Sequence, residues 1–438
     1  MIDQATVEHI RNAANIVDVV GDYVSLRRAG ANYKGLCPFH NERTPSFIVS
    51  PAKNFCHCFG CGNGGDPISF LMNLNNFTYR EALLHLANKY HIEVKEVDVS
   101  DEQIAERNRR QAYLTLCTFA AKHYQNALAA DTPESNQALQ FLNDCGISQA
   151  SISRFCIGYA DKSTLSLVNA ITEAGYSISQ ANDLGLVAPI DGAMRDVMAG
   201  CIVIPVMTKT GKEVAFAYQP IDNTGNASFA NFTSQSAIFS PKDALFAHFQ
   251  ANSNISKDKS CFMVDNPFDA IMMHQAGFTN TVAPVGEFIN RYVANDLAKQ
   301  VKDDSITIIT SSNSQEQLNR GFKLTDSLLP QGINVFCYDC APAHSLGAVI
   351  NSTHAEDFRD KVLRSRIDCI TFKAQTLIGK ATNSSELVRA IHSTLFSIKS
   401  IRDEASKQIY IDVLAQISKI KPEILVGELA KIKPFSYE

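Results

Sequence analysis

The chain has 438 residues, too many for a single hydrophobic core, so we expect two to four domains. An apolar content of 45% and a charged content of 19% are typical of a folded soluble protein, and a net charge of −5 argues against a strong nonspecific nucleic-acid binder, although not against local contact with a strand. The polar start and the absence of a long apolar run predict no secretion signal, no membrane span and a reducing, cytoplasmic location.

The first part of the chain changes from a helical to a short-strand pattern. Residues 3–22 carry apolar side chains at helical spacing, whereas residues 23–62 alternate in short runs broken by glycines, which predicts a small β ribbon. Two helices are then expected to begin after Asp66 and Thr78. We place the first domain at residues 1–94.

Four potential metal ligands lie on two tight turns of this ribbon. Cys37 and His40 stand in C-P-F-H, and Cys58 and Cys61 stand in C-F-G-C. Such a Cys₃His set closes a tetrahedron around Zn²⁺ and stabilises a fold without doing chemistry. The sequence therefore predicts one structural zinc ion, the alternative being buried free thiols. Cys56 is expected to point away from the metal.

The other cysteines lie in apolar contexts or lack a matching pair. Cys337 and Cys340 form a second C-x-x-C, for which a redox or metal role is the less favoured interpretation. The remaining six are interpreted as core residues rather than metal ligands: Cys117, Cys145, Cys156, Cys201, Cys261 and Cys369.

The rest of the chain predicts a helical part, an α/β part and a helical end. Residues 95–110 are charged and predict a helical or loose linker, and residues 111–190 predict helices. Residues 202–217 predict a hairpin with a glycine turn. Strands and helices alternate over residues 261–336, which predicts a parallel sheet. Residues 384–436 are amphipathic helices.

Residues 32–47 and 55–61, which contain both ligand pairs, closely resemble the zinc-binding domain of DnaG-type bacterial DNA primases. Residues 138–142 and 154–160 resemble the entry to the RNA-polymerase domain of that family, and the remainder is similar in order and spacing. The resemblance implies a multidomain α+β and α/β fold. It implies that the helicase-binding domain of the family is absent from this chain.

The domains that the resemblance implies are a zinc-binding ribbon domain (1–94), a linker (95–110), the N-terminal part of an RNA-polymerase-like domain (111–255), a Toprim-like α/β core (256–350) and a C-terminal helical subdomain (351–438).

In this family the Toprim core builds RNA primers with Mg²⁺ or Mn²⁺ held by clustered carboxylates. Asp265 and Asp269 match the first acidic motif and are the candidate residual catalytic residues. The second motif, Asp-Gly-Asp, falls on residues 311–313, which are Ser, Ser and Asn. A third falls near residues 341–343, also without acids, although Asp339 is close. We therefore expect weak or no binding of Mg²⁺ or Mn²⁺, and a primer-synthesis core that is inactive or weakened.

Few of the basic residues that contact nucleotide and template in this family are kept in this sequence. The family's Gly-Gly-Arg, Lys-Tyr-Leu-Asn-Ser and Phe-His-Lys-Gly motifs match residues 217–219, 228–232 and 239–242, which keep few of the basic residues. An active divergent primase would instead have to rebuild the site in an altered place from Asp265, Asp269 and Asp339, with Asp303 or Asp304 as optional further ligands.

Cations and aromatic rings are interleaved in the ribbon, as suits a single strand whose phosphates meet cations and whose bases stack on rings. We expect Phe47 and Phe59 to fill the small core instead, and His57 to face template or solvent. The candidate DNA-binding residues are Arg27, Arg28, Tyr33, Lys34 and Arg43.

The leading interpretation is a primase-family replication protein that binds single-stranded DNA through its zinc domain and extends primers poorly or not at all. Two alternatives remain: an active divergent primase that makes short RNA primers, and a non-catalytic module that docks replication proteins.

Overall fold

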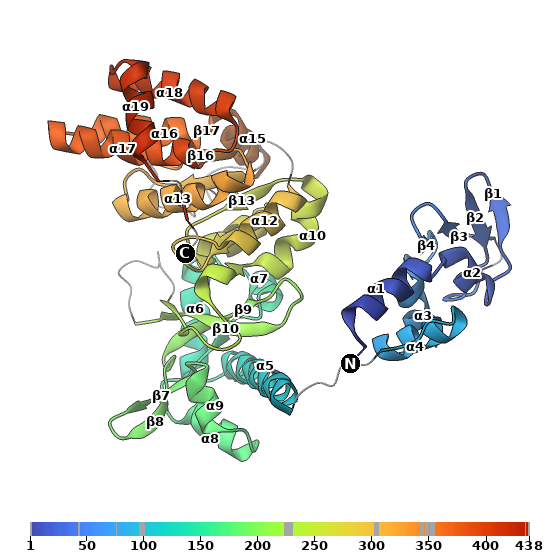
Figure 1. The fold of residues 1–438 in the computed structure, drawn as a ribbon. Helices are drawn as coiled ribbons and strands as arrows, with labels where there is room; N and C mark the ends of the chain where they lie inside the picture. The colour runs from blue at the N-terminus through green and yellow to red at the C-terminus, as the bar shows by residue number, and fades with distance from the viewer. Residues whose placement is uncertain are drawn as a thin grey trace. The chain divides into compact units, whose positions relative to one another are not determined.

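The computed structural model describes residues 2–42, 44–75, 77–95, 101–222, 231–301, 306–341, 346, 350, 355–433 and 435–436. The chain divides into two compact units, Met1–Arg107 and Asn108–Glu438 (Figure 1). No helix among these described residues is long and apolar enough to cross a membrane.

The described residues of the first unit form four complete helices and a small antiparallel sheet. The helices are α1 (Gln4–Ala13), α2 (Ile16–Gly21), α3 (Pro67–Asn75) and α4 (Tyr79–Lys89). The strands pair in chain order: β1 (Arg27–Ala29), β2 (Asn32–Gly35), β3 (Phe47–Ser50), β4 (Phe55–Cys58) and β5 (Gly64–Gly65).

Local side-chain bonds set where these helices begin. The pattern over residues 3–22 forms two helices, because the Asn15 side chain accepts the N–H of Val17 and starts the second one. The starts predicted at Asp66 and Thr78 are confirmed: Asp66 accepts the N–H of Ser69, and Thr78 forms a capping box with Glu81.

Helix α5 (Asp101–Leu128) starts inside the expected linker, before the boundary at Arg107, and continues into the second unit. The helices that follow there are α6 (Pro133–Asp144), α7 (Gln149–Arg154), α8 (Ser166–Glu173) and α9 (Ile178–Asp183). The prediction of helices up to residue 190 is wrong at its end, because β7 (Val187–Ile190) turns at Gly192 into β8 (Ala193–Asp196). Gly192 has a φ of 77°, which favours glycine at this turn.

The predicted hairpin over residues 202–217 is confirmed as β9 (Cys201–Met207) and β10 (Glu213–Pro220). It lies in a four-stranded sheet of order β11-β10-β9-β6, with β6 at Gly158–Tyr159 and β11 at Asn231–Phe232.

A six-stranded sheet follows, and its central strands are parallel as predicted. Its order is β12 (Leu245–Phe246), β14 (Thr281–Pro284), β13 (Cys261–Met263), β15 (Ile306–Thr310), β16 (Val335–Asp339) and β17 (Ile367–Asp368). The associated helices are η1 (Pro241–Asp243), α10 (His248–Asp258), α11 (Pro267–Gln275), α12 (Arg291–Gln300), α13 (Gln315–Leu328), η2 (Leu329–Gln331) and α15 (Ala355–Ser365). The carboxyl ends of parallel strands share one edge, which brings the segments after β13, β15 and β16 together.

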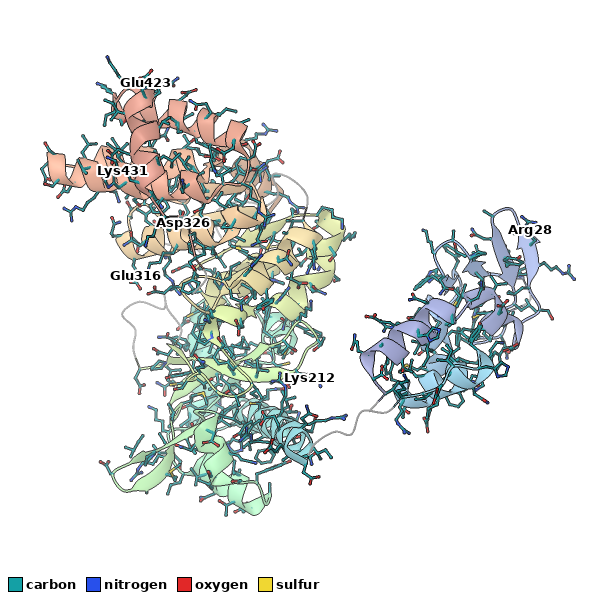
Figure 2. All side chains as sticks on the ribbon, viewed as in Figure 1. Arg28, Lys212, Glu316, Asp326, Glu423 and Lys431 are labelled. Carbon is teal, nitrogen blue, oxygen red and sulfur yellow. A yellow bond between two sulfur atoms is a disulfide. The ribbon has the colours of Figure 1, made fainter. Side chains whose placement is uncertain are left out.

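The chain then forms α16 (Cys369–Lys380), α17 (Ser384–Ser400), α18 (Glu404–Ser418) and α19 (Pro422–Lys431). A buried ion pair joins this layer to α13, because Lys373 donates to Asp326 at 3.1 Å (Asp326 is labelled in Figure 2). Ser397 completes the pair by accepting from Lys373 at 2.8 Å.

A disulfide joins Cys337 in β16 to Cys369 in α16, whose Cα atoms lie 5.1 Å apart. The sequence pattern indicates a core residue at Cys369 and groups Cys337 only with Cys340 in the C-x-x-C, so sequence reasoning missed this disulfide. The strand and the helix pack directly on one another, which places two residues distant in the sequence side by side.

Candidate functional site

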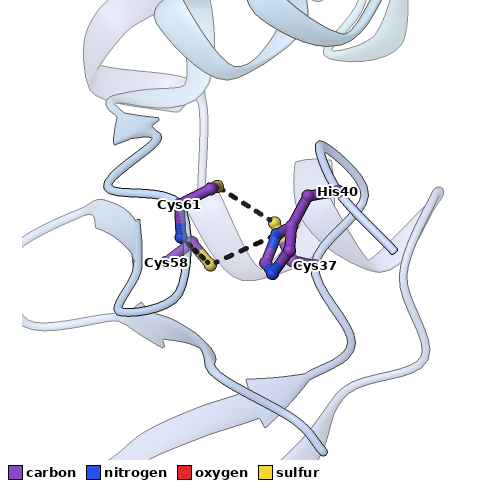
Figure 3. Close-up of side chains that lie close together, drawn as sticks. All are labelled: Cys37, His40, Cys58 and Cys61. Atoms are coloured by element: carbon purple, nitrogen blue, oxygen red, sulfur yellow. Dashed lines mark hydrogen bonds between the residues drawn. The ribbon is translucent and has the colours of Figure 1, made fainter. Parts of the chain in front are cut away.

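The four predicted ligands of the first unit lie around one point. Their ligand atoms are all within 4.8 Å of one another. The sulfurs of Cys37 and Cys61 are 3.8 Å apart, and Cys58 Sγ is 3.8 Å from His40 Nδ1 (Figure 3). A tetrahedral ion with Zn–S distances of about 2.3 Å places two sulfurs about 3.8 Å apart, so the set fits Zn²⁺.

Backbone N–H groups of the two turns point at the sulfurs. Phe39 donates to Cys37 Sγ at 3.4 Å, and Gly60 and Cys61 donate to Cys58 Sγ at 3.3 Å and 3.5 Å. Burial raises the pKa of Cys58, but the contact with Ser46 Oγ and the N–H groups of Cys61 and Gly60 outweigh it and lower the pKa to about 6. Such bonds favour the thiolate, the form that binds a metal.

Cys56 takes no part in this cluster. It lies two residues before Cys58 on β4, so both side chains point to the same, buried face of the strand. The strand therefore does not turn Cys56 to the other face, as the prediction assumes. Its sulfur instead donates to the carbonyl of Gly65 at 3.3 Å.

The opposite face of the zinc sheet carries cations and rings. The strand register places Arg27, Lys34, Ile48 and His57 opposite one another in one row. The His57 ring contacts the ring of Phe59 at 5.0 Å.

Among the aromatic residues, Phe47 is fully buried as expected, but Phe59 is 73% exposed. The prediction that Phe59 fills the core is wrong, because it follows the end of β4 on the loop between two metal ligands. Phe55, on the outer face of β4, is also exposed.

The other candidate DNA-binding residues lie elsewhere. Arg28 and Tyr33 form the neighbouring row with Val49 and Cys56, which are both buried. This row belongs to the core face of the sheet, and Arg28 extends from its edge (Figure 2). Arg43 lies outside the residues that the structure describes.

Asp265 and Asp269 meet at the carboxyl end of β13. Asp265 Oδ1 lies 3.4 Å from the Nε of Arg320, while its Oδ2 is buried without a protein partner. Burial raises the pKa of Asp265, and Arg320 partly opposes this shift. Asn266 donates to Asp269 at 2.8 Å.

The pKa of Asp269 is raised to about 7 by burial first and by the charge of Asp265 second. A carboxyl group that keeps its proton near neutral pH is a poor ligand for a divalent cation.

Asp339, the last residue of β16, is hydrogen-bonded to the turn that follows β15. Its Oδ1 accepts the N–H groups of Ser312 at 2.9 Å and Ala341 at 3.0 Å. Lys380 donates to the carbonyl of Ser312 at 2.9 Å. The edge that gathers Asp265, Asp269 and Asp339 therefore also receives cationic side chains.

Several expectations fall elsewhere. Residues 228–230, Asp303 and Asp304, and 342–343 lie outside the described residues. Sequence reasoning missed Arg320 and Lys380, because no local pattern predicts that these helical residues reach the sheet edge. It also missed Glu42, for which a signal existed: a carboxylate two residues after a ligand histidine.

The comparisons with known proteins agree with this architecture. The family model described as CHC2 zinc finger matches residues 2–103, and the model described as DNA primase catalytic core, N-terminal domain, matches residues 123–252.

Two curated relatives are similar over most of the chain. The DNA primase of Listeria monocytogenes is 28% identical over 437 residues, covering 98% of this chain and 69% of the relative. The DNA primase of Chlamydia muridarum is 30% identical over 434 residues, covering 98% of this chain and 70% of the relative.

Two solved structures share the fold. The Aquifex aeolicus primase, comprising zinc-binding and RNA-polymerase domains, has a TM-score of 0.57 at 24% identity and covers 96% of this chain and 99% of its own. A DnaG primase catalytic domain bound to single-stranded DNA has a TM-score of 0.60 at 17% identity, covering 73% and 99%.

Proposed function

The chain belongs to the DnaG-type DNA primase family, and we propose that it binds single-stranded DNA through a structural zinc domain while its core has lost most or all primer synthesis. The observation that carries the second part is the state of the sheet edge. Each of its acids is already engaged by the protein or holds a raised pKa, and the turn after β15 has no acid.

Primer synthesis needs a divalent cation that bridges the nucleotide phosphates and stabilises the charge of the transition state. Such a cation needs several ionised carboxylate oxygens converging on one point. Asp265 is paired with the guanidinium of Arg320, and one carboxylate oxygen of Asp339 accepts hydrogen bonds from two backbone N–H groups. Within the described part of the chain, the Cys/His set alone brings three or more potential ligands together.

The zinc part of the proposal rests on the ligand geometry. Cys37, His40, Cys58 and Cys61 would hold one Zn²⁺ with no open position, so the ion would stabilise the first unit and supply no catalytic chemistry. We propose no corresponding set of ligands for Mg²⁺ or Mn²⁺.

The DNA part rests on the outer face of the zinc sheet, which we call the ribbon face and define as Arg27, Lys34, Phe55, His57 and Phe59. Its cations suit phosphates and its exposed rings suit bases. Arg28 and Tyr33 lie on the other face and are not included in the proposed DNA contact. The proposed contact also involves no helicase-binding segment.

The test is a primer-synthesis assay of the full chain on single-stranded template with Mg²⁺ or Mn²⁺, with a primase that retains all the acids as positive control. We expect no extended primers and salt-sensitive strand binding. Primers that disappear in Asp265→Asn or Asp269→Asn would instead identify an active divergent primase. Strand binding that is absent at low salt would favour a protein-docking module.

A further inference from the structure

Glu42 lies beside the metal ligands and contacts both sides of the cluster. Its Oε1 accepts the N–H groups of Cys37 at 2.7 Å and Ser46 at 3.0 Å. Its Oε2 accepts the Ser46 hydroxyl and lies 3.5 Å from His40 Nε2. The Glu42 side chain is only 9% exposed, so these contacts are shielded from water.

Ser46 extends these contacts to the second turn. Its Oγ lies 3.1 Å from Cys58 Sγ. One carboxylate thus contacts the backbone of one ligand, the ring of a second and, through Ser46, the sulfur of a third. The two turns are separated along the chain by β3, and this carboxylate is where they are joined.

The ring of His40 has little freedom in this arrangement. Its Nδ1 faces Cys58 and the centre of the cluster, and its Nε2 faces Glu42. A Cβ atom placed on Gly60 would lie 2.8 Å from His40 Nε2 and 3.0 Å from Ser46 Oγ, so the second turn closes tightly over both groups. A metal-binding Nδ1 requires that the ring proton sit on Nε2.

We propose that Glu42 is the positioning residue of the zinc site: it accepts the Nε2 proton of His40, fixes the ring in the metal-binding tautomer and holds the two ligand turns at the right spacing. This rests on the zinc site proposed above. Partners of this kind change metal affinity by about ten- to a hundredfold when they are removed.

The substitution Glu42→Gln tests this role without changing the size of the side chain. A glutamine has the same size and its carbonyl can still accept the N–H groups of Cys37 and Ser46. Its amide nitrogen then faces His40 Nε2, where two donors oppose one another. The imidazole and the Ser46 hydroxyl both lose this acceptor, whereas the side chain keeps its size and the Ser46 hydroxyl can still turn to Cys58 Sγ, 3.1 Å away.

A matched control is Glu81→Gln, in the exposed capping box of α4 in the same unit. It removes a charge and weakens a helix start without contacting either ligand turn. We expect it to lower thermal stability and leave zinc affinity within about twofold.

The experiment uses the full chain and measures zinc affinity by competition with a chromophoric chelator, together with the histidine tautomer by ¹⁵N NMR. We expect Glu42→Gln to weaken zinc binding by about ten- to a hundredfold and to shift the Nε2–H proton resonance of zinc-bound His40 upfield, as loss of a hydrogen-bond acceptor does. Unchanged affinity and an unchanged Nε2–H resonance would overturn the inference about Glu42 alone, whereas a wild-type chain without stoichiometric zinc would overturn the zinc site itself. If Glu42→Gln does not fold, the wild-type spectrum decides: a proton on Nδ1 of His40 contradicts the inference.

Discussion

Asp339 accepts the backbone N–H of Ser312 at 2.9 Å, which ties the end of β16 to the turn after β15. The same oxygen accepts the N–H of Ala341 at 3.0 Å. Ser312 lies in the segment where the family resemblance expects an acidic pair. The acid that remains nearby therefore stabilises a turn, which is a structural use of a carboxylate rather than a metal-binding one.

Removing that acceptor is expected to destabilise the second unit. Asp339→Ala leaves two backbone N–H groups without their partner and should lower the free energy of unfolding by about 1–3 kcal/mol. Asp339→Asn keeps an acceptor oxygen and should cost clearly less. Denaturant unfolding of both variants, followed by a signal from the second unit, tests this. Equal losses would show that the charge matters rather than the hydrogen bonds.

The raised pKa of Asp269 predicts a pH dependence of stability. Its value of about 7 in the folded protein lies above its ordinary value of 3.8, so between these pH values the folded state holds a proton that the unfolded state has lost. The stabilisation that the protonated Asp269 gives the folded state is fully present below about pH 4. As the pH rises to about 7, the free energy of unfolding falls by about 1.4 kcal/mol per pH unit.

Asp269→Asn is expected to flatten this part of the stability curve and to be more stable than wild type at pH 8. Asparagine can still accept from Asn266 through its carbonyl. The difference between the two curves, measured by denaturant unfolding from pH 4 to 8, isolates this group and its influence on the neighbouring Asp265. Parallel curves would contradict the raised pKa.

The sequence alone predicted those features that depend on local spacing. Cys37, His40, Cys58 and Cys61 were found because two tight turns place ligands at fixed offsets, and the structure brings them together. The parallel sheet followed from strands alternating with helices, since that rhythm allows few other folds.

Features set by tertiary placement were missed. The β7–β8 hairpin has two short strands with little burial contrast, so no clear period marks it. Arg320 meets Asp265 only because α13 returns to the edge of the sheet. The exposure of Phe59 depends on its place just past the end of β4, a boundary that sequence patterns locate poorly.

Loss of one zinc ligand is expected to unfold the first unit alone. Structural zinc contributes about 10–16 kcal/mol in small zinc-binding units, which equals or exceeds the usual stability of a small domain. Cys58→Ser should therefore lose zinc and make residues 1–94 sensitive to proteolysis, while the second unit stays folded. Metal analysis and limited proteolysis of the same sample test this.

Cys56→Ser is the matched control for that variant. Cys56 lies on the same strand and face but bonds only to the carbonyl of Gly65, which a serine hydroxyl can also reach. It should retain one zinc ion per chain. Zinc loss in both variants would mean that the strand, rather than the ligand, had been disrupted.

The ribbon face predicts different effects for two adjacent arginines. Arg27 lies in the outer row with Lys34, whereas Arg28 lies in the row of the core face, and both substitutions to alanine remove one charge. Arg27→Ala should weaken binding of a single strand and lower the slope of log affinity against log salt by about 0.7, the value of one phosphate contact. Arg28→Ala should change neither quantity.

Phe59→Ala extends the same test from phosphates to bases. A base stacked on this exposed ring contributes about 1–3 kcal/mol, and that term depends little on salt. We therefore expect weaker binding with an unchanged salt slope, whereas Arg27→Ala weakens binding and also lowers the slope. Fluorescence anisotropy with a labelled oligonucleotide at several salt concentrations measures both quantities. If Arg28→Ala weakens binding as much as Arg27→Ala does, the contact is a diffuse charge effect and the ribbon face does not define it.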